Sequence, residues 1–549
     1  MRRLQNLHSF LAITAQKRPW VNVLLTGILL GLSFPPFPFP FLSLIGWVPL
    51  FYLWEYSTKK YWKTYFALLI WNVVVAYWLC LTVIGANSLS EAFQNFLAGF
   101  LANTLNPFLM SIPIVLFWFI RKKNSTILSY FGLIPLWISF EYLHFHWELT
   151  WSWLTLGHAF ASFPFYIQFI EITGIYGVSA LILLINIWTF ILLHQPRNKK
   201  ILYGLIFSVV TPLIVSILLL LPNRSVYQAE KSWKVRIIQP NIDPYQKFEV
   251  STEENQIALF TKMYEAPGID TLDLVILPET AIPFGIFYHN FEQDERLSPL
   301  MNAVKKHQVP LLTGCSEYKV FDNKAVAPST ARNFGNQWIQ SYNSSTVLGD
   351  TAHEFYEKSK LVPFVERTPY YDYLKALEQV IQIDLGGGFG NYGIPDSIYC
   401  LDGKTTNEIG NVICYESIFP HHVRQLVLKG AKFISVITND GWWGKSSGYI
   451  QHAYYARLRA IETRREVVRS ANTGLSMHID NKGNILKSSS WWKPEFFDTT
   501  IQFYNAKTFY MLWGDWFSFL ALGISVLWLL WNLINQQKQN LESLSYEKH

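Results

Sequence analysis

The sequence predicts an α-helical membrane protein that also carries one α/β domain. Of its 549 residues, 50% are hydrophobic and only 15% are charged, whereas about a quarter of the residues are charged in typical soluble proteins. The apolar residues gather in long uncharged stretches at the two ends of the chain, and the middle alternates short β-branched runs with helical patterns. This distribution excludes a disordered chain, a coiled coil and an ordinary cytosolic enzyme.

The uncharged stretches are long enough to predict membrane-spanning helices, each of which needs about 20 apolar residues. Prolines between Phe34 and Pro40 interrupt the first stretch; because proline cannot continue a helix, we expect two short spans or a re-entrant turn there. The total is then eight transmembrane helices. Residues 1–18 are too polar to begin a cleavable signal peptide. The stretches are 21–54, 65–90, 92–120, 124–140, 172–195, 201–222 and 516–535.

Basic residues predict how these spans are oriented. Lysines and arginines cluster at 2–18, 59–63, 121–123 and 197–200, and the intervening short loops, including 147–171, contain none. With these clusters assigned to the cytoplasm by the positive-inside rule, both termini lie inside. We therefore expect a membrane domain of seven spans at 1–222, an extracytoplasmic domain at 223–507, and one span with a cytoplasmic tail at 508–549. The net charge of +6 mostly reflects this topology, so we expect no nucleic-acid partner.

In the extracytoplasmic segment, the alternation of short β-branched runs with helical patterns predicts an α/β domain with helices packed on sheet faces. Expected strands are 234–239, 274–277, 309–313, 411–415 and 433–438, and expected helices are 253–264, 296–308, 421–429 and 451–464. The glycine cluster at 386–390 follows no strand and lacks the Lys-Ser/Thr of a phosphate loop, so we expect a flexible loop.

Polar residues that directly follow the expected strands are the candidates for chemistry, because α/β folds place their sites at strand ends. Glu279 follows 274–277, Cys414 follows Val412-Ile413, and Lys358 lies in the extended, proline-bounded segment 356–366. A thiol becomes a strong nucleophile when a base removes its proton or a cation stabilises its thiolate. Glu279 fits that base, and Lys358 fits the group that holds a developing oxyanion.

Spacing alone leaves alternatives open. Lys360 lies two residues from Lys358 and shares its face in an extended segment, and a surface ion pair would equally explain Glu279 and Lys358. His421 and His422 fit either the start of a helix or a Cys-His nucleophile.

The remaining polar groups have ordinary explanations. Cys80 and Cys315 fit packed residues, and a disulfide between Cys315 and Cys400 stays open in an oxidising compartment. Glu141, His144 and His146 lie near the outer end of a span, where solvation or function explains them equally. Trp147, Trp151 and Trp153 fit an interfacial aromatic belt or a rim for lipid entry. No group of His, Cys, Asp and Glu residues in the sequence has the spacing of a zinc site, so neither a metal nor another cofactor is predicted.

Several motifs together resemble the apolipoprotein N-acyltransferase family, the membrane-bound branch of the nitrilase superfamily. They occur in the family's order and within a matching arrangement of spans. The motifs are Pro278-Glu279-Thr280-Ala281, Tyr356-x-Lys358-x-x-Leu361-Val362-Pro363-Phe364-x-Glu366, Ile413-Cys414-Tyr415-Glu416, Asn439-Asp440-Gly441-Trp442-Trp443-Gly444, Arg457-x-Arg459-Ala460-x-Glu462 and Arg469-Ser470-Ala471-Asn472-Thr473-Gly474.

The resemblance implies a nitrilase-like α-β-β-α sandwich and a role for each matching residue. Glu279 is implied as general base, Lys358 as the group that steadies the tetrahedral intermediate, and Cys414 as the acyl-carrying nucleophile. Substrate-pocket residues are implied at Glu366, Tyr415, Glu416, Phe248, Trp442 and Trp443. Val365 stands where the family usually has glycine, which can displace Glu366, and Phe248 stands where some members have tryptophan.

The implied reaction is a two-step acyl transfer. Cys414 takes the sn-1 acyl chain of a phospholipid such as phosphatidylethanolamine, and the α-amine of the diacylglyceryl-cysteine of an apolipoprotein then receives it. The resemblance implies a monomer in a bacterial inner membrane, with its catalytic domain in the periplasm. The rival interpretations are a membrane-anchored amidase that acts on a small amide, and a transporter or receptor with a degenerate ectodomain.

Overall fold

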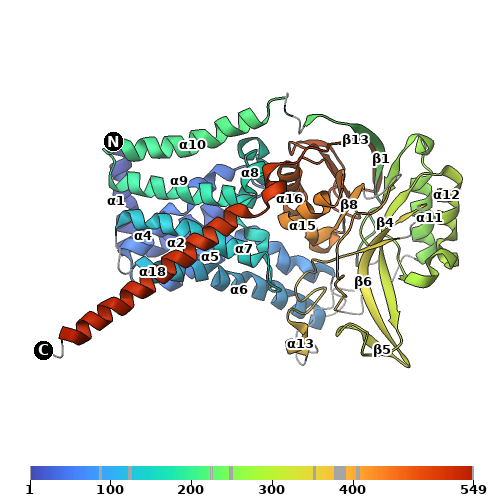
Figure 1. The fold of residues 1–549 in the computed structure, drawn as a ribbon, viewed down its shortest axis with the longest axis horizontal. Coiled ribbons are helices and arrows are strands. Elements are labelled where there is room, and N and C mark those ends of the chain that lie inside the picture. Colours follow the sequence, from blue (N-terminus) through green and yellow to red (C-terminus); the bar gives the residue numbers. More distant parts are fainter. Residues whose placement is uncertain are drawn as a thin grey trace.

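The computed structural model divides the chain into a helical part and an α/β part (Figure 1). It describes residues 2–85, 89–121, 126–222, 224, 227–245, 252–349, 354–375, 391–403 and 408–546. The helical part is built from the N-terminal segment and from the long helix α18 (Trp516–Tyr546), which runs back along it. The start of α1 (Arg2–Lys17) and the end of α18 both lie at the side of the helical part that is remote from the sheets.

Five helical segments are long and apolar enough to cross a membrane among the residues that the structure describes. They are Lys60–Thr82, Glu91–Arg121, Tyr176–His194, Lys199–Leu219 and Trp516–Asn535. These segments contain α5 (Lys60–Ala76), most of α6 (Leu89–Arg121), α9 (Tyr176–His194), α10 (Lys199–Leu219) and the first part of α18. A helical region with membrane-spanning character is therefore confirmed.

The other three expected spans are shorter helices. The proline-rich segment separates α2 (Pro19–Gly31, 13 residues) from α3 (Ser43–Gly46) and α4 (Val48–Tyr56, 9 residues), as the proline pattern predicts. Helix α7 (Leu133–His144) has 12 residues. At 1.5 Å per residue these helices are shorter than the roughly 30 Å of a bilayer core, so the structure supports five spans by length and not eight. The short helices α8 (Ile170–Thr173) and α17 (Phe509–Trp513) contact helix α16 (Ser447–Thr463) of the α/β part.

The α/β part contains two sheets. The first has the strand order β13-β1-β2-β4-β6-β5, with β3 paired to β4 and β7 paired to β6; the second has the order β12-β11-β10-β9-β8. Strands β1, β2 and β4 run parallel, as do β8, β9 and β10. The strands are β1 (Lys231–Gln239), β2 (Leu274–Ile276), β3 (Gly285–Phe287), β4 (Leu311–Phe321), β5 (Arg332–Phe334), β6 (Gln337–Leu348), β7 (Phe355–Glu357), β8 (Ile409–Ile413), β9 (Phe433–Thr438), β10 (Val467–Ala471), β11 (Met477–Ile479), β12 (Ile485–Ser488) and β13 (Glu495–Phe503).

The alternation of side chains along the strands produces four layers. In β2, Leu274 and Ile276 face the second sheet in one core, while Val275 packs with α11 (Glu253–Tyr264) and α12 (Ser298–His307) in another. Helices α15 (Pro420–Leu428) and α16 (Ser447–Thr463) cover the outer face of the second sheet. Since successive strand residues point to opposite faces, apolar runs such as this one fill both cores. The expected α-β-β-α sandwich is confirmed.

The main departures from the expected elements are in the second half of the domain. The expected strand 411–415 is wrong at its end, because β8 stops at Ile413 and Cys414 begins a 3₁₀ turn, Cys414–Ile418. The long strand β6 and the strands β10 to β13 were not expected, since many of their residues are polar. Seven consecutive residues of β6, from Gln340 to Thr346, are buried although most are polar, so this strand shows no apolar alternation.

The domain is held on the helical part by buried polar contacts from α16. The amide of Gln451 donates to the carbonyls of Pro35 and Val75 (2.8 and 2.9 Å), and its oxygen accepts from the indoles of Trp78 and Trp153 (3.1 and 2.7 Å). All four hydrogen-bonding positions of this side chain are thus used across the boundary between the two parts. Because buried polar groups are costly when unpaired, these bonds favour one fixed orientation of the domain.

Candidate active site

Glu279 and Lys358 meet beyond the ends of two strands of the first sheet, β2 and β7, that are separated by β4 and β6. Glu279 follows β2 and Lys358 follows β7, and both side chains are buried. Lys358 Nζ lies 3.2 Å from Glu279 Oε1. Two further donors fix the Glu279 carboxylate: the amide of Asn343, at 2.8 Å, and the backbone N–H of Asn439, at 3.1 Å. Three donors fix this carboxylate in one orientation.

Glu366 is the second carboxylate partner of Lys358. Its Oε1 lies 2.7 Å from Lys358 Nζ and its Oε2 accepts from the backbone N–H of Val362 at 2.8 Å. Burial alone lowers the pKa of Lys358, but the charges of Glu279 and Glu366 outweigh it, and the pKa lies well above the usual value. Lys358 is therefore a permanent cation. Val365 does not displace Glu366; the loop turns through Phe364, whose φ is +63°.

Cys414 lies at the sharp turn that follows β8, and the residue as a whole is partly exposed. Its φ of +51° falls in the left-handed region, which is strained for a residue with a side chain. Burial raises the pKa of the thiol, the Glu279 carboxylate raises it further, and the Lys358 cation only partly offsets them. At neutral pH the resting side chain is thus a thiol, and a base is needed to make it a nucleophile.

Glu416 joins the turn of Cys414 to the Lys358 segment. The carboxylate is fully buried; its Oε1 accepts from the backbone N–H of Ser359 at 2.7 Å and its Oε2 from the backbone N–H of Ile413 at 2.9 Å. The hydroxyl of Tyr356 also donates to Oε2, at 2.8 Å, and lies 2.8 Å from Nε2 of His422. Glu416 and His422 therefore position the two segments, and His422 lies in a helix start, as expected.

His452 supports the Cys414 turn from α16. Its Nε2 lies 3.0 Å from the carbonyl oxygen of Cys414, and its Nδ1 lies 2.8 Å from Asp440 Oδ1. Asp440 in turn pairs with Arg469 at 2.6 Å, and both side chains are fully buried. Burial raises the pKa of Asp440, but the charges of Arg469 and His452 outweigh it and lower the pKa overall. The motif residues Asp440 and Arg469 thus hold the histidine behind the backbone of Cys414.

Aromatic side chains connect the site to the helical part. The hydroxyl of Tyr415 donates to the carbonyl of Thr150 at 3.0 Å. The ring of Trp443 lies 4.4 Å from that of Trp78 and 6.0 Å from that of Trp153, measured between centroids. Trp442 packs edge-on against Tyr245, whose hydroxyl donates to the Trp442 carbonyl at 2.7 Å. The tryptophans Trp78 and Trp153 of the helical part are therefore in direct contact with the α/β domain.

The other expected residues are accounted for as follows. Lys360 points elsewhere: its Nζ lies 5.7 Å from the centroid of the Phe419 ring. The cysteines Cys80, Cys315, Cys400 and Cys414 are all free, and Cys315 and Cys400 belong to different cores, so the possible disulfide is wrong. Phe248 and the glycine cluster 386–390 lie outside the described residues.

Two site residues were missed, and in one case the sequence carried a signal. Asn343, on the unexpected strand β6, donates to Glu279 and lies 3.2 Å from Glu366. Nothing near Asn343 distinguishes it in the sequence. His452 lies inside an expected helix, but it follows the Asn439-Asp440-Gly441 motif and is one of only 13 histidines, which made it a candidate for the buried partner of Asp440.

Glu141 and His144 have structural contacts on the helical side. Glu141 Oε1 accepts from the indole of Trp137 at 2.9 Å and from the backbone N–H of Leu156 at 2.8 Å, and His144 Nε2 accepts from the backbone N–H of Trp151 at 3.1 Å. Both residues thereby anchor the loop that carries Trp151 and Trp153.

The arrangement brings together a carboxylate, a permanent cation and a protonated thiol at a strained turn. A carboxylate can accept the thiol proton and return it to a leaving group, and a cation can stabilise an oxyanion. Such a site is suited to acyl transfer through a thioester. Side chains alone can carry out these proton transfers and the acyl transfer, without a metal ion or an organic cofactor.

Comparison with known proteins identifies both parts of the chain. Residues 234–509 match the model of the carbon-nitrogen hydrolase family, and residues 26–188 match that of the apolipoprotein N-acyltransferase N-terminal domain. A carbon-nitrogen hydrolase from Helicobacter pylori has a TM-score of 0.35 and 16% identity, over 49% of this chain and 89% of that chain.

Curated relatives match over nearly the full length. The apolipoprotein N-acyltransferase of Chlorobaculum tepidum is 30% identical over 92% of this chain and 95% of its own length. The apolipoprotein N-acyltransferase of Geobacter metallireducens is 27% identical over 92% and 94%, respectively. The chain therefore belongs to the apolipoprotein N-acyltransferase family.

Proposed function

We infer that the protein is an acyltransferase that moves an acyl chain from the sn-1 position of a phospholipid to the α-amine of the diacylglyceryl-cysteine of apolipoproteins. The similarity to acyltransferases over 92% of the chain carries this inference, because it includes the helical part as well as the α/β domain. A soluble amidase would need no such helical part. The intact cluster of Glu279, Lys358 and Glu366 equally favours an enzyme over a degenerate ectodomain.

In the first step, we propose that Glu279 accepts the proton of the Cys414 thiol. The thiolate attacks the ester carbonyl of the phospholipid, and the Lys358 ammonium stabilises the oxyanion of the tetrahedral intermediate. When the intermediate collapses, the carbon–oxygen ester bond breaks and Glu279 gives the proton to the lysophospholipid hydroxyl. The raised pKa of Lys358 supports this role, since the cation persists throughout the cycle.

In the second step, the α-amine of the diacylated acceptor attacks the thioester carbonyl. Glu279 takes a proton from the amine, an amide bond forms, and the proton returns to the Cys414 sulfur as the carbon–sulfur bond breaks. The raised pKa of Cys414 favours this return, because the free enzyme holds its thiol protonated. Exclusion of water from the site protects the thioester from hydrolysis.

We further propose that Trp442, Trp443 and Tyr415 border the path of the acyl chain, together with Phe248. The contact between Trp443 and Trp78 supports this proposal, since it puts an aromatic residue of the catalytic domain against the helical part. Glu366 and Glu416 have positioning roles: Glu366 orients Lys358, and Glu416 orients the Cys414 turn.

For the membrane arrangement, we propose a monomer in a bacterial inner membrane, with eight crossings, the catalytic domain in the periplasm and both termini in the cytoplasm. The basic clusters support this orientation by the positive-inside rule. So does the position of α1 and the end of α18, away from the sheets (Figure 1).

Product analysis tests the proposed reaction. Purified protein is incubated with phospholipid labelled in its sn-1 chain and with a synthetic diacylated lipopeptide. We expect label in the N-acylated peptide and one lysophospholipid per transfer. Labelled free fatty acid with an unchanged peptide would instead favour an amidase-like hydrolase and contradict the proposal.

A further inference from the structure

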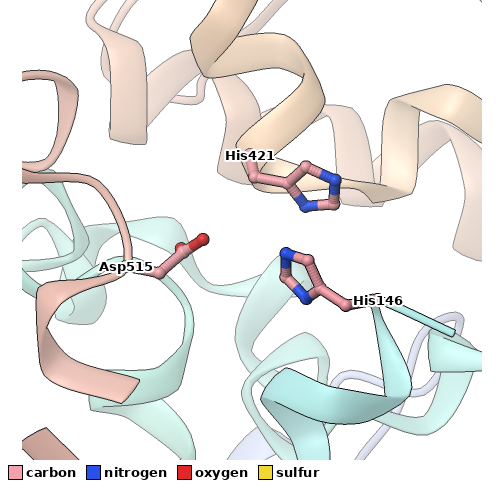
Figure 2. A group of neighbouring side chains, drawn as sticks. All are labelled: His146, His421 and Asp515. Carbon is pink, nitrogen blue, oxygen red and sulfur yellow. The ribbon is translucent and has the colours of Figure 1, made fainter. Parts of the chain in front are cut away.

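A second cluster of polar side chains lies away from the proposed active site, where three segments of the chain converge. His146 follows α7, His421 lies in α15, and Asp515 lies between α17 and α18. One ligand atom of each residue lies within 4.8 Å of the others. Figure 2 shows the Asp515 carboxylate directed toward the two imidazole rings.

We propose that His146, His421 and Asp515 bind one Zn²⁺ ion that clamps the catalytic domain to the helical part. Two imidazole nitrogens and one carboxylate oxygen are a ligand set that zinc favours, with a water molecule in the fourth tetrahedral position. Harder ions such as Mg²⁺ and Ca²⁺ prefer sites made of oxygen ligands.

The orientation of His146 prepares it as a ligand. Its Nδ1 lies 2.7 Å from the carbonyl oxygen of Tyr142. A carbonyl only accepts hydrogen bonds, so Nδ1 carries the proton and Nε2 presents its lone pair. Metal-binding histidines are commonly oriented in this way by a backbone carbonyl on the other nitrogen. His146 is also exposed, which leaves a path for the ion to enter.

His421 and Asp515 have binding capacity that their protein contacts leave unused. The Nδ1 atom of His421 is buried and has no hydrogen-bond partner among the residues that the structure describes. Asp515 is 8% exposed, and its Oδ1 accepts from the hydroxyl of Tyr510 at 2.9 Å. Unpaired polar atoms are costly inside a protein, and an ion bound here would satisfy them.

The geometry requires only a small closure. A tetrahedral zinc ion with ligands at about 2.0–2.1 Å holds its ligand atoms about 3.4 Å apart, so the three side chains would approach by rotamer adjustments on binding. The rings of His146 and His421 already lie 4.5 Å apart, inclined by 29°.

Nearby cations are occupied by other partners. Arg424 donates to the carbonyls of Tyr510 and Met511, and Arg459 pairs with Glu462 at 2.8 Å. The Asp515 carboxylate supplies negative charge for a divalent ion.

Such a clamp would act on the site through α15. That helix begins directly after the Cys414–Ile418 turn, so fixing His421 to the helical part fixes the position of the nucleophile relative to the membrane. The spacing of His146, His421 and Asp515 could not reveal the cluster, because the three residues come from distant parts of the sequence.

Metal content tests the proposal directly. Untagged full-length protein in detergent is treated with a chelator, equilibrated with Zn²⁺ and desalted, and its zinc is measured by mass spectrometry. We expect one zinc per chain, a thermal midpoint several degrees higher than in the chelator, and no displacement by a tenfold excess of Mg²⁺. His146→Gln, His421→Gln and Asp515→Asn should each weaken binding at least tenfold.

The matched control is His307→Gln, which removes a surface histidine that pairs with Asp270 and Glu265. This variant should bind zinc like the wild type. Co²⁺ bound to the wild type should give the visible absorption of a tetrahedral N/O site, a readout that does not depend on the folding of any variant. Absence of bound zinc in the wild type, or unchanged affinity in all three variants, would overturn the proposal.

Discussion

Lys358 Nζ lies closer to Glu366 than to Glu279, at 2.7 Å against 3.2 Å. One ammonium is therefore shared by two carboxylates that have different surroundings. Glu366 is fixed at its other oxygen by the backbone of Val362, while Glu279 is fixed by Asn343 and Asn439. This geometry supports the proposal that Glu366 holds the lysine and that Glu279 transfers protons.

The first prediction concerns that division of labour. Glu366→Gln keeps the shape of the side chain but removes the charge that holds Lys358. We expect the rate of acyl-enzyme formation to fall by about 10²-fold, within the range for a lost oxyanion donor. The measurement is transfer of labelled acyl chain from phospholipid to the enzyme. Glu354→Gln, at an exposed position just before β7, is the control; equal rates in the two variants would show that Glu366 has no such role.

The pH dependence of thiol alkylation tests the electrostatics of the site. The pKa of Cys414 is raised above its usual value of about 8.5, so alkylation of the resting enzyme should still be accelerating above that pH. Glu279 raises this pKa and Lys358 lowers it. Glu279→Gln should therefore shift the inflection to lower pH, and Lys358→Gln should shift it to higher pH. The Cys414→Ala variant measures the background from the other cysteines, and shifts in the same direction would refute the assignment.

His452 is predicted to position the nucleophile without contacting substrate. His452→Ala removes the contact at 3.0 Å to the carbonyl of Cys414 and the partner of Asp440. We expect kcat for acylation to fall by about 10-fold or more while KM changes little, since misplacement of reacting atoms affects the transition state most. His452→Gln, which retains a donor, should recover part of the rate. A change confined to KM would instead indicate a role in substrate binding.

Glu416 is predicted to matter for stability. Its carboxylate is buried and accepts hydrogen bonds from donors of both the Lys358 and the Cys414 segments. Glu416→Gln turns one acceptor into a donor that faces other donors, and should cost about 1–3 kcal/mol for each group left unpaired. Thermal unfolding in detergent measures the loss. Glu254→Gln, at an exposed position in α11, should leave the midpoint unchanged.

Because Gln451 attaches the α/β domain to the helical part, we expect its substitution to weaken this attachment. Gln451→Ala leaves the carbonyls of Pro35 and Val75 and the indoles of Trp78 and Trp153 without their partner. We expect faster proteolysis at the boundary and a lower thermal midpoint. Gln425→Ala, on the neighbouring helix α15, is the comparison, and equal protease sensitivity of the two variants would contradict the docking role.

Sequence patterns predicted the parts of the fold that depend on local periodicity. Helix α11 and strand β9 begin and end where the apolar pattern places them. Strand β6 was missed because Asn343, Ser344, Ser345 and Thr346 are polar yet buried, facing the site or neighbouring strands. Their burial is determined by tertiary contacts, such as the bond from Asn343 to Glu279, that no local pattern contains.

The candidate site was predictable only in part. The positions of Glu279 and Cys414 after expected strands made them candidates. The preference for Lys358 over Lys360 depended on a family resemblance. The structure explains this preference, because the Lys358 side chain points toward Glu279 and the Lys360 side chain points toward Phe419. Asn343 and His452 reach the site from elements far away in the sequence. Of the eight expected crossings, the structure supports five by helix length. The other three hydrophobic stretches have the composition of a span but fold into shorter helices and turns, as around Pro35 and Pro36.

The intact mass of the enzyme tests the central claim most directly. Full-length protein is incubated with a phospholipid of defined sn-1 chain, without acceptor, and its mass is measured before and after addition of a diacylated lipopeptide. The account predicts a gain of one acyl group that hydroxylamine removes, that is lost to the peptide when the acceptor arrives, and that Cys414→Ala never acquires. An acyl group of the same mass on the Cys414→Ala variant, or peptide acylation by that variant at the wild-type rate, would contradict it.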